Sequence, residues 1–313
     1  MRYFLVSLVL AVSIGGSSCG RKLSTGVSID RELRPYVPPD ANVLASFDLD
    51  RLKAAPLYQH NESRLVFPLM DASSERIGLD PRRDVSRVLV AWNGKDALFI
   101  ARGQFSAPVV QQKLLALGVR TSAYGRYTLL ALDRASLVFP KTSIAVAGSS
   151  EAVRHVLDGT NRHEADLAPE FEERLEDIPK GDQIWAVSRG GLPFGEMSMR
   201  SDYESALSNI VGYVRGGSLG IGIDTGAHIA ADLTCASGQG AQRVHDALRA
   251  GIAFGRLSTK DNEQELLQIY DAIQVTQDKE IVRVRADYPA NLAAKLIAYL
   301  NDLNFAKGRP NAR

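Results

Sequence analysis

The chain has 313 residues, of which 45% are hydrophobic and 23% charged, values that are ordinary for a globular protein. Lysine and arginine total 37 against 36 aspartates and glutamates, which gives a formal net charge of +1. Proteins that bind nucleic acid usually carry a basic excess or a basic stripe, so this balance argues against a nucleic-acid partner. The length allows one large domain or two of medium size.

The N-terminus has the three parts of a secretory signal. Arg2 supplies the positive end, residues 4–14 form an apolar run, and Gly15-Gly16-Ser17-Ser18 is a cleavage zone of small residues. The apolar run is much shorter than the roughly 20 residues that cross a bilayer as a helix. We therefore expect residues 1–18 to be a cleaved signal peptide and the protein to be exported.

Cys19 follows the small residues directly. The segment resembles a bacterial lipoprotein signal, in which cleavage leaves a diacylated cysteine as the first mature residue. Ser17-Ser18 fits that pattern, whereas Gly16 stands where the family usually has leucine. The resemblance implies a lipid on Cys19 and a membrane anchor on the periplasmic or extracellular side. Gly20, in place of aspartate, resembles the pattern for sorting to the outer membrane. An ordinary cleaved signal without lipid is the alternative.

Residues 19–36 are polar and weakly patterned, which predicts a lipidated tether before a body that starts at Val37-Pro38-Pro39. Alternation predicts a strand from Val43 to about Asp50, followed by a largely helical stretch to about residue 74. Asn93-Gly94 predicts a hairpin between strands 85–92 and 96–102. The first half then continues with a helix from about 106 to 118, strands near 127–132, 136–139 and 143–147, and a short helix ending at 157.

The same order of elements recurs in the second half of the chain. A strand is expected at 183–188, a helical segment near 193–210, and paired strands at 218–224 and 228–235. Two helices, strands near 273–275 and 280–286, and a last helix from Pro289 follow. We therefore expect a module at 37–160, a linker helix within 161–181, a similar module at 182–304, and a flexible tail at 305–313.

This order predicts an α+β fold made of two similar modules of the ferredoxin-like, split βαβ type with extra strands. The sheets are expected to be mostly antiparallel, with helices packed on one face. The opening stretch 37–50 also resembles the start of repeated units in uncharacterised bacterial envelope proteins. That resemblance implies a location and a fold and supplies no catalytic residue.

The sequence has none of the common signatures of catalysis or cofactor binding. It contains no phosphate-binding G-x-x-x-x-G-K-[ST] loop, no G-x-S-x-G elbow, no H-E-x-x-H and no paired cysteine motif. No cofactor and no catalytic residue is therefore predicted. The glycine-rich stretch 216–222 lacks dinucleotide-binding spacing and favours a strand that is bulged or closely approached. Cys235 alternates with apolar residues, which favours a buried, inert thiol over a catalytic or redox cysteine.

Three pairs of polar residues are weak candidates for a site. Asp48 and Asp50 share the polar face of the first strand and could bind a hard cation or divide acid and base roles. A solvated face, or capping of the next helix by Asp50, would also explain them. Arg283 and Arg285 form a basic pair on a late strand, interpreted as an exposed face balanced by acids. His228 and Asp232 share one strand face but stand about 13 Å apart, too far for contact.

The favoured hypothesis is a non-catalytic binding module of the bacterial envelope, held to the membrane by its N-terminal lipid and binding another envelope protein. Two alternatives place a site in the groove between the modules, where the protein would either bind a small ligand or act as a hydrolase.

Overall fold

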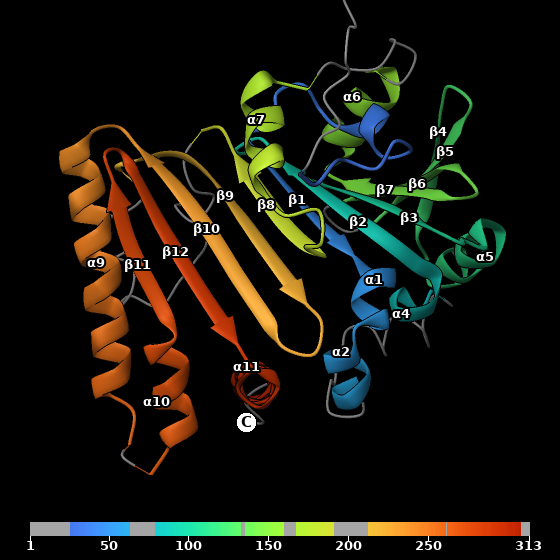
Figure 1. The fold of residues 1–313 in the computed structure, drawn as a ribbon. Coiled ribbons are helices and arrows are strands. Elements are labelled where there is room, and N and C mark those ends of the chain that lie inside the picture. Colours follow the sequence, from blue (N-terminus) through green and yellow to red (C-terminus); the bar gives the residue numbers. More distant parts are fainter. Residues whose placement is uncertain are drawn as a thin grey trace, which may run out of the picture.

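A computed structural model describes residues 26–62, 79–132, 135–159, 167–190, 212–260 and 262–307. The α+β class and the antiparallel arrangement are confirmed, since every pair of neighbouring strands is antiparallel. The described strands of both halves join into a single sheet (Figure 1), which has 12 strands within the described residues. Its order is β11-β12-β10-β9-β8-β1-β2-β3-β7-β6-β5-β4.

The first half of the chain supplies seven strands of this sheet: β1 (Val43–Asp48), β2 (Val85–Trp92), β3 (Ala97–Gly103), β4 (Arg120–Tyr124), β5 (Tyr127–Ala131), β6 (Ser136–Lys141) and β7 (Ile144–Gly148). The second half supplies five: β8 (Ile184–Ser188), β9 (Val214–Ile223), β10 (Ala227–Cys235), β11 (Ile273–Asp278) and β12 (Ile281–Tyr288).

The two halves place their strands in the same spatial order. The first runs β1-β2-β3-β7-β6 outward from the centre, and the second runs β8-β9-β10-β12-β11. They meet where the first strand of each half pairs with the other, with Ala45 opposite Ala186. The hairpin β4–β5 extends the first half beyond this shared order.

Helices cover both faces of the sheet, so the prediction that they pack on one face is wrong (Figure 1). The face that carries Leu44, Leu89 and Trp185 packs against the short 3-10 helix η1 (Arg34–Tyr36), α6 (Ser150–Gly159) and α7 (Pro169–Asp177). The strand register places Ala286 and Val282 on the opposite face. In the second half that face is covered by α9 (Gly238–Leu257), α10 (Gln264–Asp271) and α11 (Ala290–Lys307).

The remaining described helices belong to the first half: α1 (Leu49–Ala54), α2 (Pro56–Asn61), α4 (Pro81–Asp84) and α5 (Ala107–Ala116). Val110 and Leu114 of α5 are buried against Leu130, on the face opposite to α6. The first half thus has helices on both faces, whereas α9, α10 and α11 share one face of the second half.

Part of the expected tether belongs to the folded body. Residues 26–36 pack on the body, with Val27 and Leu33 buried in the largest core cluster. The backbone N–H of Val27 donates to the carbonyl of Ile178 at 3.1 Å, which ties this segment to the end of α7. The apolar residues are too widely spaced to form a periodic pattern, so the sequence reads as polar although these side chains complete the core.

The linker helix expected within 161–181 is present as α7, and its Phe171 and Leu175 are buried. Another boundary differs from expectation. Helix α11 runs to Lys307, past the expected start of the tail at 305. The predicted helical segment 193–210 lies outside the described residues, as do Cys19 and the signal. No helix among the described residues combines the length and the apolar character needed to cross a membrane.

Candidate functional site

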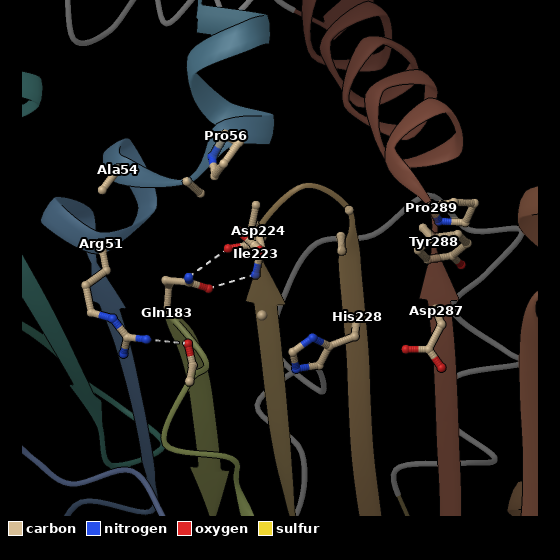
Figure 2. Close-up of a pocket in the computed structure, with 15 residues that line it drawn as sticks. Arg51, Ala54, Pro56, Gln183, Ile223, Asp224, His228, Asp287, Tyr288 and Pro289 are labelled. Atoms are coloured by element: carbon tan, nitrogen blue, oxygen red, sulfur yellow. Dashed lines mark hydrogen bonds between the residues drawn. The ribbon is translucent and has the colours of Figure 1, made fainter.

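A groove lies where the two halves meet, beside the ends of strands in the middle of the sheet (Figure 2). One wall comes from α1 and α2 of the first half, including Arg51 and Pro56. The other wall comes from the ends of β9, β10 and β12 and the loop before β8. The cavity measures about 850 Å³ and is open to solvent, and its polar lining includes Arg51, Gln183, Asp224, His228 and Asp287.

The docking of α2 onto the second half fixes the width of this groove. Pro56 begins α2, and the N–H of Leu57 donates to the carbonyl of Asp224 at 2.8 Å. The Leu57 side chain is buried in a cluster with Ile269 and Tyr288. A helix of the first half is therefore anchored in the apolar core of the second.

Two side chains brace the floor of the groove. The amide of Gln183 accepts from the N–H of Ile223 and donates to its carbonyl, both at 2.8 Å (Figure 2). The guanidinium of Arg51 donates to the carbonyls of Lys180 and Gly181 at 3.1 and 2.7 Å. Gln183 is buried, and these bonds satisfy backbone groups at the strand ends. Both residues are thereby held in place to shape the groove.

His228 stands beside this floor with a buried carboxylate behind it. Its Nε2 lies 2.7 Å from Oδ1 of Asp182, whose side chain is fully buried, while the imidazole is 44% exposed. A carboxylate in this position fixes the orientation and tautomer of the ring. The imidazole ring also lines the groove (Figure 2).

The glycine-rich stretch of β9 makes room for this pair. A Cβ at Gly222 would lie 1.9 Å from Cε1 of His228, and a Cβ at Gly220 would lie 2.2 Å from Oδ2 of Asp182. The predicted close approach to the strand is therefore present. Sequence reasoning paired His228 only with Asp232 on its own strand. It missed Asp182, which lies in the loop before β8 and carries no periodic signal.

Two carboxylates at the groove are free to meet a ligand. The side chains of Asp224 and Asp287 make no hydrogen bond or ion pair with any described residue. Asp287 stands opposite His228 in the β10–β12 register, so both side chains project from the same face. The groove therefore offers hydrogen-bond acceptors beside an oriented imidazole, in a lining that also holds Arg51 and Gln183.

The candidate pair Asp48 and Asp50 is not brought together as a site. Asp48 ends β1, is buried, and pairs with Arg87, while its Oδ1 accepts from the N–H of Arg51 and caps α1. Asp50 lies within α1 and pairs with Lys53 at 3.4 Å, so the expected cap by Asp50 is wrong. Within the described residues, no group of three or more His, Cys, Asp and Glu side chains could hold a metal ion.

Asp48 belongs instead to an ion-pair cluster beneath the N-terminal segment. Arg87 also lies 3.3 Å from Asp30, and Arg102 lies 2.8 Å from the same Asp30 oxygen. The Asp30 side chain is only 6% exposed. The cluster holds residues 26–36 against β2 and β3. It also gives Asp48, at the end of β1, a structural role.

The other candidate residues are explained by their contacts within the fold. Arg285 lies 2.6 Å from Asp232 and Arg283 lies 3.4 Å from Asp278, as expected for a strand face balanced by acids. Cys235 is buried, and this burial is the main cause that raises the pKa of its thiol. The negative charge of nearby Glu280 raises the same pKa further. A raised pKa keeps the thiol protonated, in agreement with the prediction of an inert cysteine.

Replacing Gly222 by alanine is expected to displace the His228 ring and to lower the free energy of unfolding by about 1–3 kcal/mol, because the new methyl group overlaps the imidazole. Chemical denaturation would measure the change. The matched control is Gly251→Ala in α9, where a Cβ meets nothing within 4 Å and alanine should be neutral or stabilising. Equal stability of the two variants would contradict a close-packed His228.

No family model matches the sequence, and no curated protein matches it. Among solved structures, crystal form III of TP0453 is 12% identical, with a TM-score of 0.51, and the alignment covers 87% of this chain and 99% of that chain. Crystal forms I and IV are 11% and 10% identical, with TM-scores of 0.47 and 0.49, and cover 87% of this chain. The form III alignment shows that this chain shares its fold with TP0453.

Proposed function

We propose that this chain is a lipid-anchored bacterial envelope protein that binds a segment of another envelope protein in the groove between its halves. The observation that carries the proposal is the groove itself, in which His228 is oriented by buried Asp182 and flanked by Asp287, whose carboxylate has no partner among the described residues. Such a lining favours a segment with positively charged or hydrogen-bond-donating groups. The proposed location in the envelope rests on the expected export signal at residues 1–18 and the expected lipid on Cys19.

Binding is favoured over catalysis by the composition of the lining. None of the described residues that line the groove is a serine, threonine, cysteine or lysine, so carboxylates, one imidazole and one phenol are the only nucleophilic types among them. A second candidate function, hydrolysis, has one observation in its favour. An imidazole held by a buried carboxylate is the arrangement of a general base, which could activate a water molecule.

The anchor is tested by mass spectrometry of the mature N-terminal peptide from fractionated bacterial membranes. We expect an acylated Cys19 as the first residue, and we expect the variant Cys19→Ala to leave the membrane fraction, because two or more acyl chains give stable anchoring. A non-acylated terminus on a soluble protein would make the chain a free exported protein.

The groove is tested by crosslinking in intact envelopes followed by native pull-down. We expect Asp287→Arg to lose the crosslinked partner, because it replaces an exposed acceptor in the groove by a cation. Asp278→Arg, at the far end of the β11–β12 hairpin, is the matched control and should retain it. If both variants retain the partner, the groove is not the binding site. A hydrolytic activity that is lost in His228→Ala would favour the second candidate function.

A further inference from the structure

Strand β4 forms one edge of the sheet, at the end opposite to β11 (Figure 1). Its residues Arg120, Thr121, Ser122 and Ala123 are exposed, and only Tyr124 is half-buried. Tyr124 packs against the largest core cluster, and the other four residues of the strand contribute no buried side chain. The first four side chains of the strand and its outer backbone edge face solvent on both sides of the sheet.

This edge lacks the usual protection against pairing with another strand. Exposed edges are normally blunted by prolines, bulges, inward charges or a covering helix. Strand β4 has no proline, pairs with β5 without a register shift, and carries one charge, Arg120, at its start. At the other edge, the inner residues of β11 lie beneath α9, where Val275 joins the cluster around Val244.

The hairpin register determines which backbone groups are free. Tyr124 pairs with Tyr127 across the two-residue loop Gly125-Arg126, and Gly125 has a φ of +56°. In a hairpin of this kind, the residues that flank the loop exchange both hydrogen bonds, and the pattern alternates along the strand. The N–H and C=O groups of Thr121 and Ala123 therefore point outward from the edge.

Strand β4 is complementary to itself when it is turned antiparallel about Ser122. Thr121 would then face Ala123 of the second copy, so that the outward backbone groups of both strands meet. Arg120 would face Tyr124 of the second copy. Charge supports this pairing, because the Arg120 side chain makes no hydrogen bond or ion pair with a described residue. The hydroxyl of Tyr124 donates to the exposed carboxylate of Asp158 at 2.7 Å, which places an acid beside the incoming arginine.

We propose that β4 pairs with β4 of a second copy, which would join two 12-stranded sheets into one across a two-fold axis at Ser122. Arg120 of each copy reaches Asp158 of the other, whereas the Tyr124 ring keeps its own Arg154, 5.5 Å from the ring centroid. This interface is separate from the groove, so it goes beyond the proposed function and stands or falls independently of it.

The first test is disulfide trapping of the full chain in bacterial membranes. Ser122→Cys places two thiols directly opposite each other at a non-hydrogen-bonded pair, where Cα atoms stand about 4.5 Å apart, within disulfide reach. We expect mild oxidant to give at least tenfold more covalent dimer than in the control Thr128→Cys, whose residue is exposed on β5, one strand further in. The unmodified chain controls for Cys19 and Cys235.

The second test exchanges the charges. Arg120→Glu and Asp158→Arg should each reduce trapping of Ser122→Cys at least fivefold, and the two together should restore it, because each pair would again be opposite in sign. Thr121→Pro removes an outward N–H without touching the β4–β5 ladder and should abolish trapping. Overturning results are equal trapping at positions 122 and 128, or a charge-exchanged variant that stays as low as the single variants.

Discussion

Replacing Arg87 by alanine is expected to lower the free energy of unfolding by about 3–5 kcal/mol, because the change leaves the buried carboxylate of Asp48 without its cation. Asp48 loses its ionic partner, and Asp30 keeps only Arg102. The Asp30 and Asp48 side chains are 6% and 10% exposed, so water replaces the guanidinium poorly. Urea denaturation followed by circular dichroism would measure the loss.

The matched control for this change is Arg256→Ala. Arg256 pairs with Asp271 at 2.7 Å, but the two side chains are 51% and 53% exposed, and exposed pairs contribute about 0–1 kcal/mol. Limited proteolysis adds a second measurement, since residues 26–36 should become the first cleaved segment in Arg87→Ala. If both variants lose the same small amount, the cluster does not hold the N-terminal segment.

Removing His228 is expected to cost about 1–3 kcal/mol, because the fully buried carboxylate of Asp182 then keeps no hydrogen-bond partner among the described residues. The loss should be smaller than for Arg87, since the imidazole is 44% exposed and the open groove admits water. Unfolding free energies of His228→Ala, Asp182→Ala and the double variant form a cycle that isolates the pair.

In that cycle, the double variant should be less destabilised than the sum of the two single variants, since each single change already breaks the same interaction. Gln183→Ala is a useful comparison, because Gln183 braces the neighbouring strand end and does not touch the imidazole. Strict additivity of His228→Ala and Asp182→Ala would show that the two side chains do not interact in solution.

Most strands could be predicted from the sequence because one of their faces is buried. The hairpin about Asn93-Gly94 is confirmed as β2 and β3, and the strand predicted at 183–188 is confirmed as β8. Strand β4 was missed, since a strand exposed on both sides shows no alternation of apolar and polar residues. Strand β9 starts at Val214, earlier than predicted, because glycines interrupt its pattern.

The candidate site was largely out of reach of sequence reasoning. Its key contact joins Asp182 in a loop to His228 on β10, and only the sheet order brings them together. The glycines of β9 carried a signal of close approach but could not name the group that approaches. Asp48 and Asp50 were singled out by strand alternation, which fails there because β1 ends at Asp48 and a helix begins at Leu49.

The pairing of β1 with β8 has a consequence for the order in which the chain folds. Val43 is placed opposite Ser188, so the inner edge of the first half stays open until most of the chain has been made. Forming this contact closes a very long loop, and contacts of this kind slow folding. In the interval, β1 presents an unpaired edge that can join a strand of another nascent chain. A chain that stops before residue 184 would keep that edge permanently and should aggregate.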